Sequence, residues 1–135
     1  MISKNKLKYL SSLKIKKYRL NESKVLIEGY RLIDESITAN ANIKYIFYSK
    51  KFLDNNLHVE FMNILKNKKI SAIQTSQKNI NQLADSINNQ GIIAIIDLPN
   101  IKKDLLNVNQ LILDSISDPG NLGNLFRTAD WFGLK

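Results

Sequence analysis

The sequence has no cysteine, one histidine, one tryptophan and two prolines among its 135 residues. Without cysteine the chain can form no disulfide and has no thiolate nucleophile. One histidine and scattered carboxylates give no spacing typical of metal ligands, so we expect no metal site. No apolar run approaches the roughly 18 residues that span a membrane, and the N-terminal segment lacks the apolar core of a signal peptide. We therefore expect a cytoplasmic protein without a membrane partner.

Acidic residues are absent from the first 20 positions, which hold seven of the 20 basic side chains. The rest of the chain has 13 basic and 12 acidic residues, so nearly all of the net charge of +8 lies in this segment. Such a concentration of positive charge attracts phosphates. The alternative is a solvated, lysine-rich helix face. The candidate contacts to an RNA backbone in this segment are Lys14, Lys16, Lys17 and Arg19.

Strand and helix patterns alternate over residues 22–97. A helix is expected over 2–19, 30–39 and 54–67 and again after Ser76, and strands are expected over 24–29, 43–48, 70–74 and 92–96. This alternation predicts a three-layer α/β/α sandwich with a parallel or mixed central sheet. The apolar run Ile92–Ile96 is typical of a strand that is covered on both faces.

Two of the expected helices have clear apolar stripes. In the first, Asp54 is the predicted N-cap, and the stripe consists of Leu57, Phe61, Ile64 and Leu65. In the second, Ser76 is the predicted N-cap, and the stripe consists of Ile80, Leu83, Ala84 and Ile87.

The C-terminal region is expected to contain a linker over 98–110, a strand over 111–116 and a helix over 119–132. Asp118 can cap this helix, and Pro119 suits its first position. Arg127 would lie about 12 Å along the helix, from where its long side chain can reach back toward the loop. From the residues alone, three other interpretations stay open. Arg127 forms a surface ion pair, the turn binds a nucleotide without a G-x-G-x-x-G motif, or Asp114 and Asp118 hold magnesium.

Three segments of the chain resemble the SpoU/TrmH family of RNA ribose 2′-O-methyltransferases. The most specific is Asp114…Asp118-Pro-Gly-Asn121-Leu-Gly123…Arg127-Thr-Ala…Phe132-Gly133, which is similar to the family's first motif. The other two are Arg19…Val25-Leu-Ile-Glu28-Gly29-Tyr-Arg31 and Asn89-Gln90-Gly91-Ile-Ile-Ala94. Their order and spacing agree with the family over essentially the whole chain.

The resemblance implies two modules. The first is a ribosomal-protein-like α/β/α domain that binds the RNA substrate. The second is a knotted methyltransferase domain, which holds S-adenosylmethionine and forms a homodimer in the intact enzyme. We therefore divide the chain into a basic helix (1–21), a substrate-binding domain (22–97), a linker (98–110) and the start of a methyltransferase domain (111–135). The later family motifs are absent, so we expect this chain alone neither to bind S-adenosylmethionine nor to methylate RNA.

The resemblance also assigns candidate roles to individual residues. Arg127 and Asn121 match the catalytic arginine and the asparagine of the first motif, and Arg19 and Arg31 are the favoured RNA contacts. Glu28 and Gly29 are expected to have structural roles. The implied reaction is attack by a ribose 2′-hydroxyl on the donor's methyl group. The free guanidinium of Arg127 is a poor base, so we expect it to hold a phosphate or ribose and to stabilise negative charge.

Two other functions remain possible at this point. One is a stand-alone RNA-binding module without catalytic activity, and the other is a protein-interaction domain with no RNA role. Members of the family act on ribosomal or transfer RNA, and we favour ribosomal RNA as the substrate.

Overall fold

The structure is a computed structural model that describes residues 2–99 and 110–134. The chain divides into two compact units, Met1–Pro99 and Asn100–Lys135. Most of the predicted linker at 98–110 lies outside the described residues.

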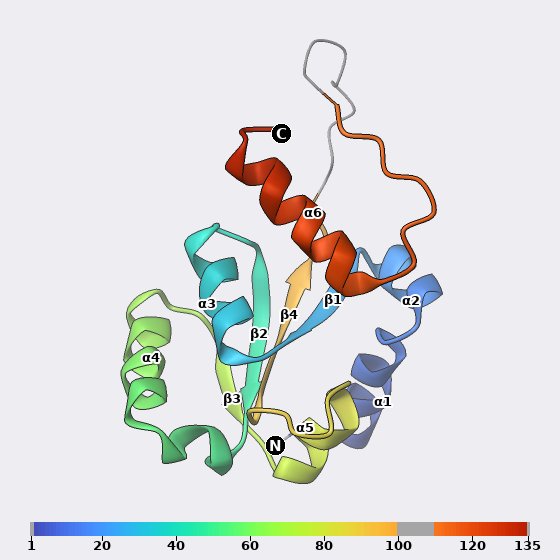
Figure 1. Cartoon of the computed structure of the whole chain (residues 1–135). Coiled ribbons are helices and arrows are strands. Elements are labelled where there is room, and N and C mark those ends of the chain that lie inside the picture. Colours follow the sequence, from blue (N-terminus) through green and yellow to red (C-terminus); the bar gives the residue numbers. More distant parts are fainter. Residues whose placement is uncertain (1, 100–109, 135) are drawn as a thin grey trace. The chain divides into compact units, whose positions relative to one another are not determined.

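The first unit is built on a four-stranded mixed sheet (Figure 1). Its strands are β1 (Lys24–Glu28), β2 (Ile43–Tyr48), β3 (Ala72–Gln74) and β4 (Ile92–Asp97). Their order is β1-β4-β2-β3, with β4 antiparallel to both of its neighbours and β3 parallel to β2. The four strands occur close to the predicted positions, and the sheet is mixed rather than parallel.

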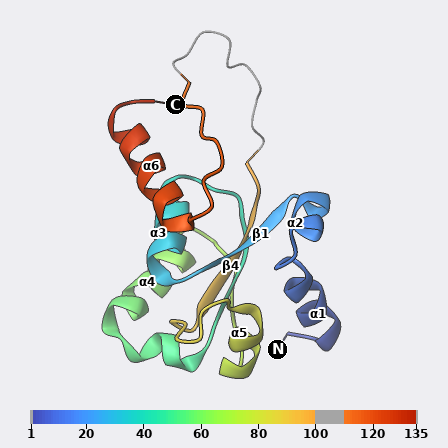
Figure 2. The same ribbon diagram turned by 45° about the vertical axis from the view of Figure 1, so that its right-hand side comes forward.

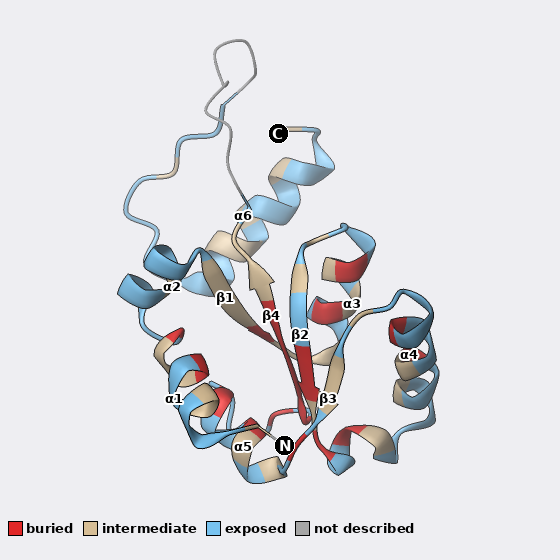
Figure 3. Cartoon of the chain, turned by 180° about the vertical axis from the view of Figure 1, so that it is seen from behind, coloured by how far each residue is buried: buried red, intermediate tan, exposed pale blue. Residues whose placement is uncertain are grey.

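Helices cover both faces of this sheet, which confirms the predicted three-layer fold (Figure 1). One face packs against α3 (Tyr30–Thr38), α4 (Asn56–Asn67) and the 3-10 turn η1 (Lys50–Asp54). The other face packs against α1 (Lys4–Ser12) and α5 (Gln77–Leu83). The buried residues gather in the first part of β4, in the second half of β2 and on the inner sides of these helices (Figure 3).

The predicted stripes are only partly buried. Phe61 and Leu65 of α4 lie in the core, whereas Leu57 is 63% exposed because only one side of this helix faces the sheet. Asn55, not Asp54, caps α4, since η1 extends through Asp54 and its side chain accepts no helix N–H. Ser76 caps α5 as predicted. Ile87 lies beyond the end of α5 and is 96% exposed, so its predicted place in the stripe is wrong.

The single N-terminal helix predicted over residues 2–19 is also wrong. The chain forms α1 and then a separate α2 (Lys16–Glu22), with the extended residue Ile15 before α2. The Tyr9 hydroxyl donates to Glu22 Oε2 at 3.0 Å. In a continuous helix these residues would be about 20 Å apart along the axis. The break lets Leu10 and Leu13 enter the core while α2 turns back toward β1.

The second unit contains α6 (Pro119–Trp131). The Asp118 carboxylate accepts from the backbone N–H of Asn121 at 2.7 Å, and Pro119 occupies the first turn, as predicted. The predicted strand over 111–116 does not form, and residues 110–118 have no regular secondary structure. A strand needs a neighbour for its backbone hydrogen bonds, and the apolar residues of this segment have none among the described residues.

Candidate nucleic-acid interface

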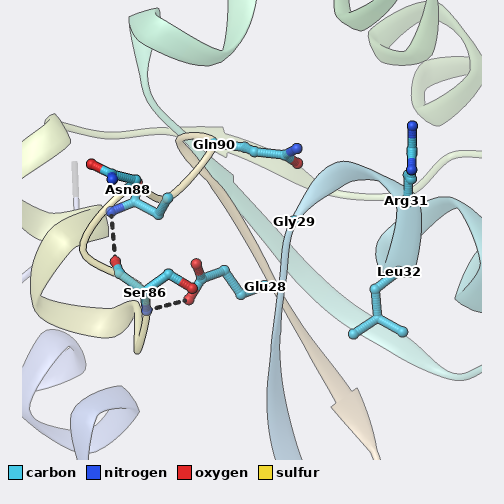
Figure 4. A pocket seen from close by; sticks show the side chains of 8 residues that line it. Glu28, Gly29, Arg31, Leu32, Ser86, Asn88 and Gln90 are labelled. Atoms are coloured by element: carbon cyan, nitrogen blue, oxygen red, sulfur yellow. Dashed lines mark hydrogen bonds between the residues drawn. The ribbon is translucent and has the colours of Figure 1, made fainter. Parts of the chain in front are cut away.

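Two of the segments singled out in the sequence meet at one hollow in the first unit (Figure 4). The turn from β1 to α3 brings Glu28, Gly29 and Arg31, and the loop before β4 brings Asn88 and Gln90. The hollow is open, has a volume of about 440 Å³ and is lined mainly by polar groups. An open polar hollow of this kind suits a charged or hydrogen-bonding ligand better than an apolar one.

Gln90 ties the two segments together. Its side-chain oxygen accepts from the backbone N–H of Tyr30 at 2.7 Å, at the first turn of α3. Gly29 has φ +94°, and a Cβ at that position would lie 3.4 Å from the same Gln90 oxygen. Glycine therefore allows both the turn and the close approach of Gln90. Among the described residues, Gln90 Nε2 has no hydrogen-bond partner, so it can donate to a ligand.

Glu28 has a structural role, as expected. Its carboxylate accepts from the backbone N–H of Asp85 at 2.9 Å and from that of Ser86 at 3.3 Å. Figure 4 shows Glu28 and Ser86 pointing toward one another across the hollow. Because these bonds give hydrogen-bond partners to two backbone N–H groups of the turn that follows α5, Glu28 orders the loop before β4.

A buried polar network supports the same loop from below. Asn89, only 4% exposed, accepts through Oδ1 from Gln77 Nε2 at 2.9 Å and from Gly91 N at 3.2 Å. Its Nδ2 donates to Asn81 Oδ1 at 3.0 Å. The buried Ser49 hydroxyl donates to Gln77 Oε1 at 2.6 Å. Sequence reasoning missed Ser49, Gln77 and Asn81, because nothing local shows that residues so far apart share one network.

Two of the predicted RNA contacts are engaged within the protein. Lys14 Nζ donates to the Ala84 carbonyl at 2.7 Å and pairs with Asp85 at 3.0 Å. Arg19 donates to the carbonyl of Lys14 at 2.6 Å, which caps the end of α1. The backbone N–H of Asp85 also donates to Glu28, which lines the hollow. The ion pair from Lys14 to Asp85 therefore connects the basic segment to the edge of the hollow.

The other three predicted contacts are open to solvent. Lys16 and Lys17 are exposed on α2, and the described residues include no ion-pair partner for either. Arg31 is exposed and lines the hollow, where Figure 4 shows its side chain extending away from Glu28.

The views in Figure 1 and Figure 2 both place α1 and α5 side by side, on the sheet face opposite to α3 and α4.

In the second unit, Asn121 and Arg127 are both exposed on α6. Arg127 donates to Asn124 Oδ1, and its Nη1 lies 3.8 Å from the position that a Cβ on Gly123 would occupy. The guanidinium therefore folds back toward the N-terminal half of the helix, and Gly123 leaves room for it. Within residues 110–134 Arg127 has no carboxylate partner. Asn124 is a contact that sequence reasoning did not identify.

The described part of the chain offers no group of three or more His, Asp or Glu side chains placed to hold a metal ion. Asp118 caps α6, and the Asp114 carboxylate accepts from the Ser115 hydroxyl at 3.0 Å. In the same residues no helix is both long and apolar enough to cross a membrane.

The sequence matches the family described as the MRM3-like substrate-binding domain over residues 4–94. It is 31% identical over 134 residues to the human mitochondrial rRNA methyltransferase 3, covering 93% of this chain and 31% of that protein. It is 28% identical over 131 residues to the 23S rRNA (guanosine(2553)-2′-O)-methyltransferase RlmP of Bacillus subtilis, covering 96% of this chain and 48% of that protein.

The fold also matches a solved structure, the SpoU methyltransferase AviRb from Streptomyces viridochromogenes in complex with the cofactor AdoMet. The TM-score is 0.75 at 18% identity, and the match covers 98% of this chain and 51% of that one. At this identity the likeness shows the fold alone. The chain thus spans about a third to a half of the length of the relatives it matches. Because the family match takes in α1 and most of the sheet, the chain belongs to the SpoU/TrmH family of RNA methyltransferases, with an MRM3-like substrate-binding domain.

Proposed function

We propose that this chain is the RNA-binding portion and first catalytic motif of an enzyme that methylates ribose 2′-hydroxyls in ribosomal RNA. The observation that carries the proposal is the hollow at which Glu28-Gly29 and Asn89-Gln90 meet, within a domain of a substrate-binding family. The relatives are named as rRNA methyltransferases, which favours an enzyme over a stand-alone RNA-binding module and ribosomal over transfer RNA.

RNA binding is proposed to use two kinds of contact. Lys16, Lys17 and Arg31 supply exposed positive charge, which binds phosphates and makes the affinity depend on salt. Lys14 and Arg19 act mainly by holding α1 and the loop before β4 in place, because their charged groups already have partners. The hollow supplies the Nε2 donor of Gln90 and the guanidinium of Arg31 to the same RNA.

The basic helix region (1–21), the domain over 22–97 and the linker (98–110) would together present the RNA to the part that begins at 111. In that part, Asn121 and Arg127 are the proposed catalytic residues. Arg127 would hold a phosphate or ribose of the substrate with its planar fork and stabilise negative charge that develops on the 2′-oxygen. The Arg127 guanidinium lies beside Gly123, which supports a position for the bound phosphate or ribose near the start of α6.

S-adenosylmethionine is the proposed methyl donor of the intact enzyme, which we propose to be a homodimer in the cytoplasm. No side chain of α6 is buried, so the described residues of this unit do not form an enclosed site for the cofactor. The chain by itself is therefore proposed not to bind the cofactor. The human relative, by contrast, is named as a mitochondrial protein.

An Arg127→Lys change tests the catalytic proposal. It should be made in a full-length family member whose first motif aligns with residues 114–133. Lysine keeps the charge but loses the two-pronged geometry, so methyl incorporation into ribosomal RNA should fall by about 10-fold or more, while the affinity for RNA changes little. Near-normal methylation would contradict the role given to Arg127.

A further inference from the structure

Beside α1 lies a surface that combines exposed tyrosines with lysines, and none of these side chains is among the RNA contacts proposed above. A hollow of about 160 Å³ has an apolar floor of Leu10 and Ile95. A second hollow of about 360 Å³ lies along α1 and α2. Tyr9 lines both of them, so they are neighbours. We call these residues the tyrosine surface: Lys6, Lys8, Tyr9, Tyr18, Lys24, Lys44 and Tyr45.

The rings of this surface are accessible to a ligand. Tyr9, Tyr18 and Tyr45 are 39%, 45% and 38% exposed. Within residues 2–99 and 110–134, these three are the only exposed tyrosines, and all of them lie here. Tyrosines scattered by chance over a surface would need no explanation, but three around adjoining hollows form a platform.

Two of the rings are held in place before any ligand arrives. The Tyr9 hydroxyl donates to Glu22 Oε2 at 3.0 Å, and Tyr45 stacks on Phe47 with ring centroids 6.2 Å apart. Burial and this hydrogen bond raise the pKa of Tyr9, so its hydroxyl stays protonated. Rings that are already oriented lose little conformational freedom when they bind.

The charge around the rings is positive. Lys6 Nζ lies 3.9 Å from the centre of the Tyr45 ring, and neither Lys6 nor Lys8 has a carboxylate partner among the described residues. Lys24 and Lys44 are paired with Glu22 and Asp97 at 3.9 and 2.9 Å. Four lysines against two carboxylates leave the surface with a net positive charge, which suits an anionic ligand with flat apolar parts.

We propose that the tyrosine surface binds unpaired nucleotides of RNA, with bases stacked on the tyrosines and phosphates held by the lysines. This rests on the proposed function and adds to it a second contact region, separate from the hollow at Glu28 and Gln90. Unpaired RNA fits because stacking requires access to the face of a base, which a duplex hides. The site therefore selects a single-stranded part of the substrate.

The test measures the affinity of the full chain for fluorescein-labelled oligouridine of about 12 nucleotides, a length within the range that such platforms bind. An abasic strand of the same length and an RNA duplex serve as reference ligands. The variants are Tyr9→Leu, Tyr18→Leu, Tyr45→Leu and the conservative Tyr9→Phe. Lys66→Gln, on the exposed side of α4 over the opposite face of the sheet, is the control for loss of one charge.

Each leucine variant should weaken oligouridine binding by about fivefold or more and leave the abasic strand unaffected. Tyr9→Phe and Lys66→Gln should stay within about twofold of the wild type. The Tyr18 hydroxyl makes no hydrogen bond within residues 2–99 and 110–134, so Tyr18→Leu keeps the test valid if Tyr9→Leu disturbs α1. Salt-dependent binding that no leucine variant weakens, or an equal loss on the abasic strand, would overturn this proposal and leave the proposed function intact. No salt-dependent binding by the wild type would overturn both.

Discussion

Asn89→Ala removes the centre of the polar network beneath the loop before β4. The side chain makes three hydrogen bonds of 2.9–3.2 Å, to Gln77, Asn81 and Gly91, and a longer one of 3.5 Å to the Ser86 carbonyl. Gln77 and Asn81 keep their bond to each other at 2.7 Å, so the buried Gly91 N–H is the group left without a partner. At about 0.5–1.5 kcal/mol for each bond, the free energy of unfolding should fall by about 2–4 kcal/mol.

For a unit of this size, that loss should lower Tm by roughly 10 °C or more. Urea and thermal unfolding of the wild type and the variant measure it directly. Asn63→Ala is the matched control, because Asn63 is exposed on α4, and it should change stability by less than about 0.5 kcal/mol. If Asn89→Ala cost less than about 1 kcal/mol, the network would not hold this loop, and the account of the hollow would be wrong.

Four further predictions concern two glycines, two lysines, the methyl donor and Tyr9. Gly91→Ala should lower the free energy of unfolding by about 2 kcal/mol or more, because residue 91 has φ +82° and a Cβ there would lie 2.6 Å from Ser49 Oγ. Gly133 also has a positive φ but has open space around it, so Gly133→Ala should cost only about 1 kcal/mol. Thermal unfolding measures both. Lys14→Ala should lower Tm, whereas Lys16→Ala should leave it within about 2 °C, since only Lys14 holds the end of α5. Isothermal titration of this chain with S-adenosylmethionine should show no binding, and a Kd below about 100 µM would contradict the proposal that the cofactor site lies outside this chain. The pKa of Tyr9 is raised above 10.0, so the folded state holds this proton more tightly. The hydrogen bond from Tyr9 to Glu22, which joins α1 to α2, should therefore weaken as the pH rises past about 10. Phenolate absorbance, compared between the wild type and Tyr9→Phe, measures this titration.

The regular part of the fold could be predicted because its patterns are local. Apolar spacing placed Ile80 and Leu83 in the core, and the uninterrupted run at Ile92–Ile96 predicted a strand covered on both faces, which is β4. The break at Ile15 was missed because it depends on the tie from Tyr9 to Glu22 and on where Leu13 is buried. The strand over 111–116 was wrong because an apolar run becomes a strand only beside another strand.

The candidate site likewise combines features that local sequence patterns predict with features that depend on distant contacts. The motifs around Glu28, Gly29 and Gln90 could be recognised from the family, but their meeting at one hollow depends on the sheet order. The role of Lys14 could not be predicted, because its partners Ala84 and Asp85 lie 70 positions or more further along the chain. The sequence suggested Lys14, Lys16, Lys17 and Arg19 alike as RNA contacts, whereas the structure separates the engaged Lys14 and Arg19 from the exposed Lys16 and Lys17.

The most direct test of RNA binding by this chain is its affinity for a labelled ribosomal RNA fragment as a function of salt. The wild type should give a linear fall of log K with log salt. The triple variant Lys16→Ala, Lys17→Ala, Arg31→Ala should reduce the slope by about 2–3, because each phosphate contact contributes about 0.7–0.9. Absence of salt-dependent binding, or a slope that the triple variant does not change, would contradict the account.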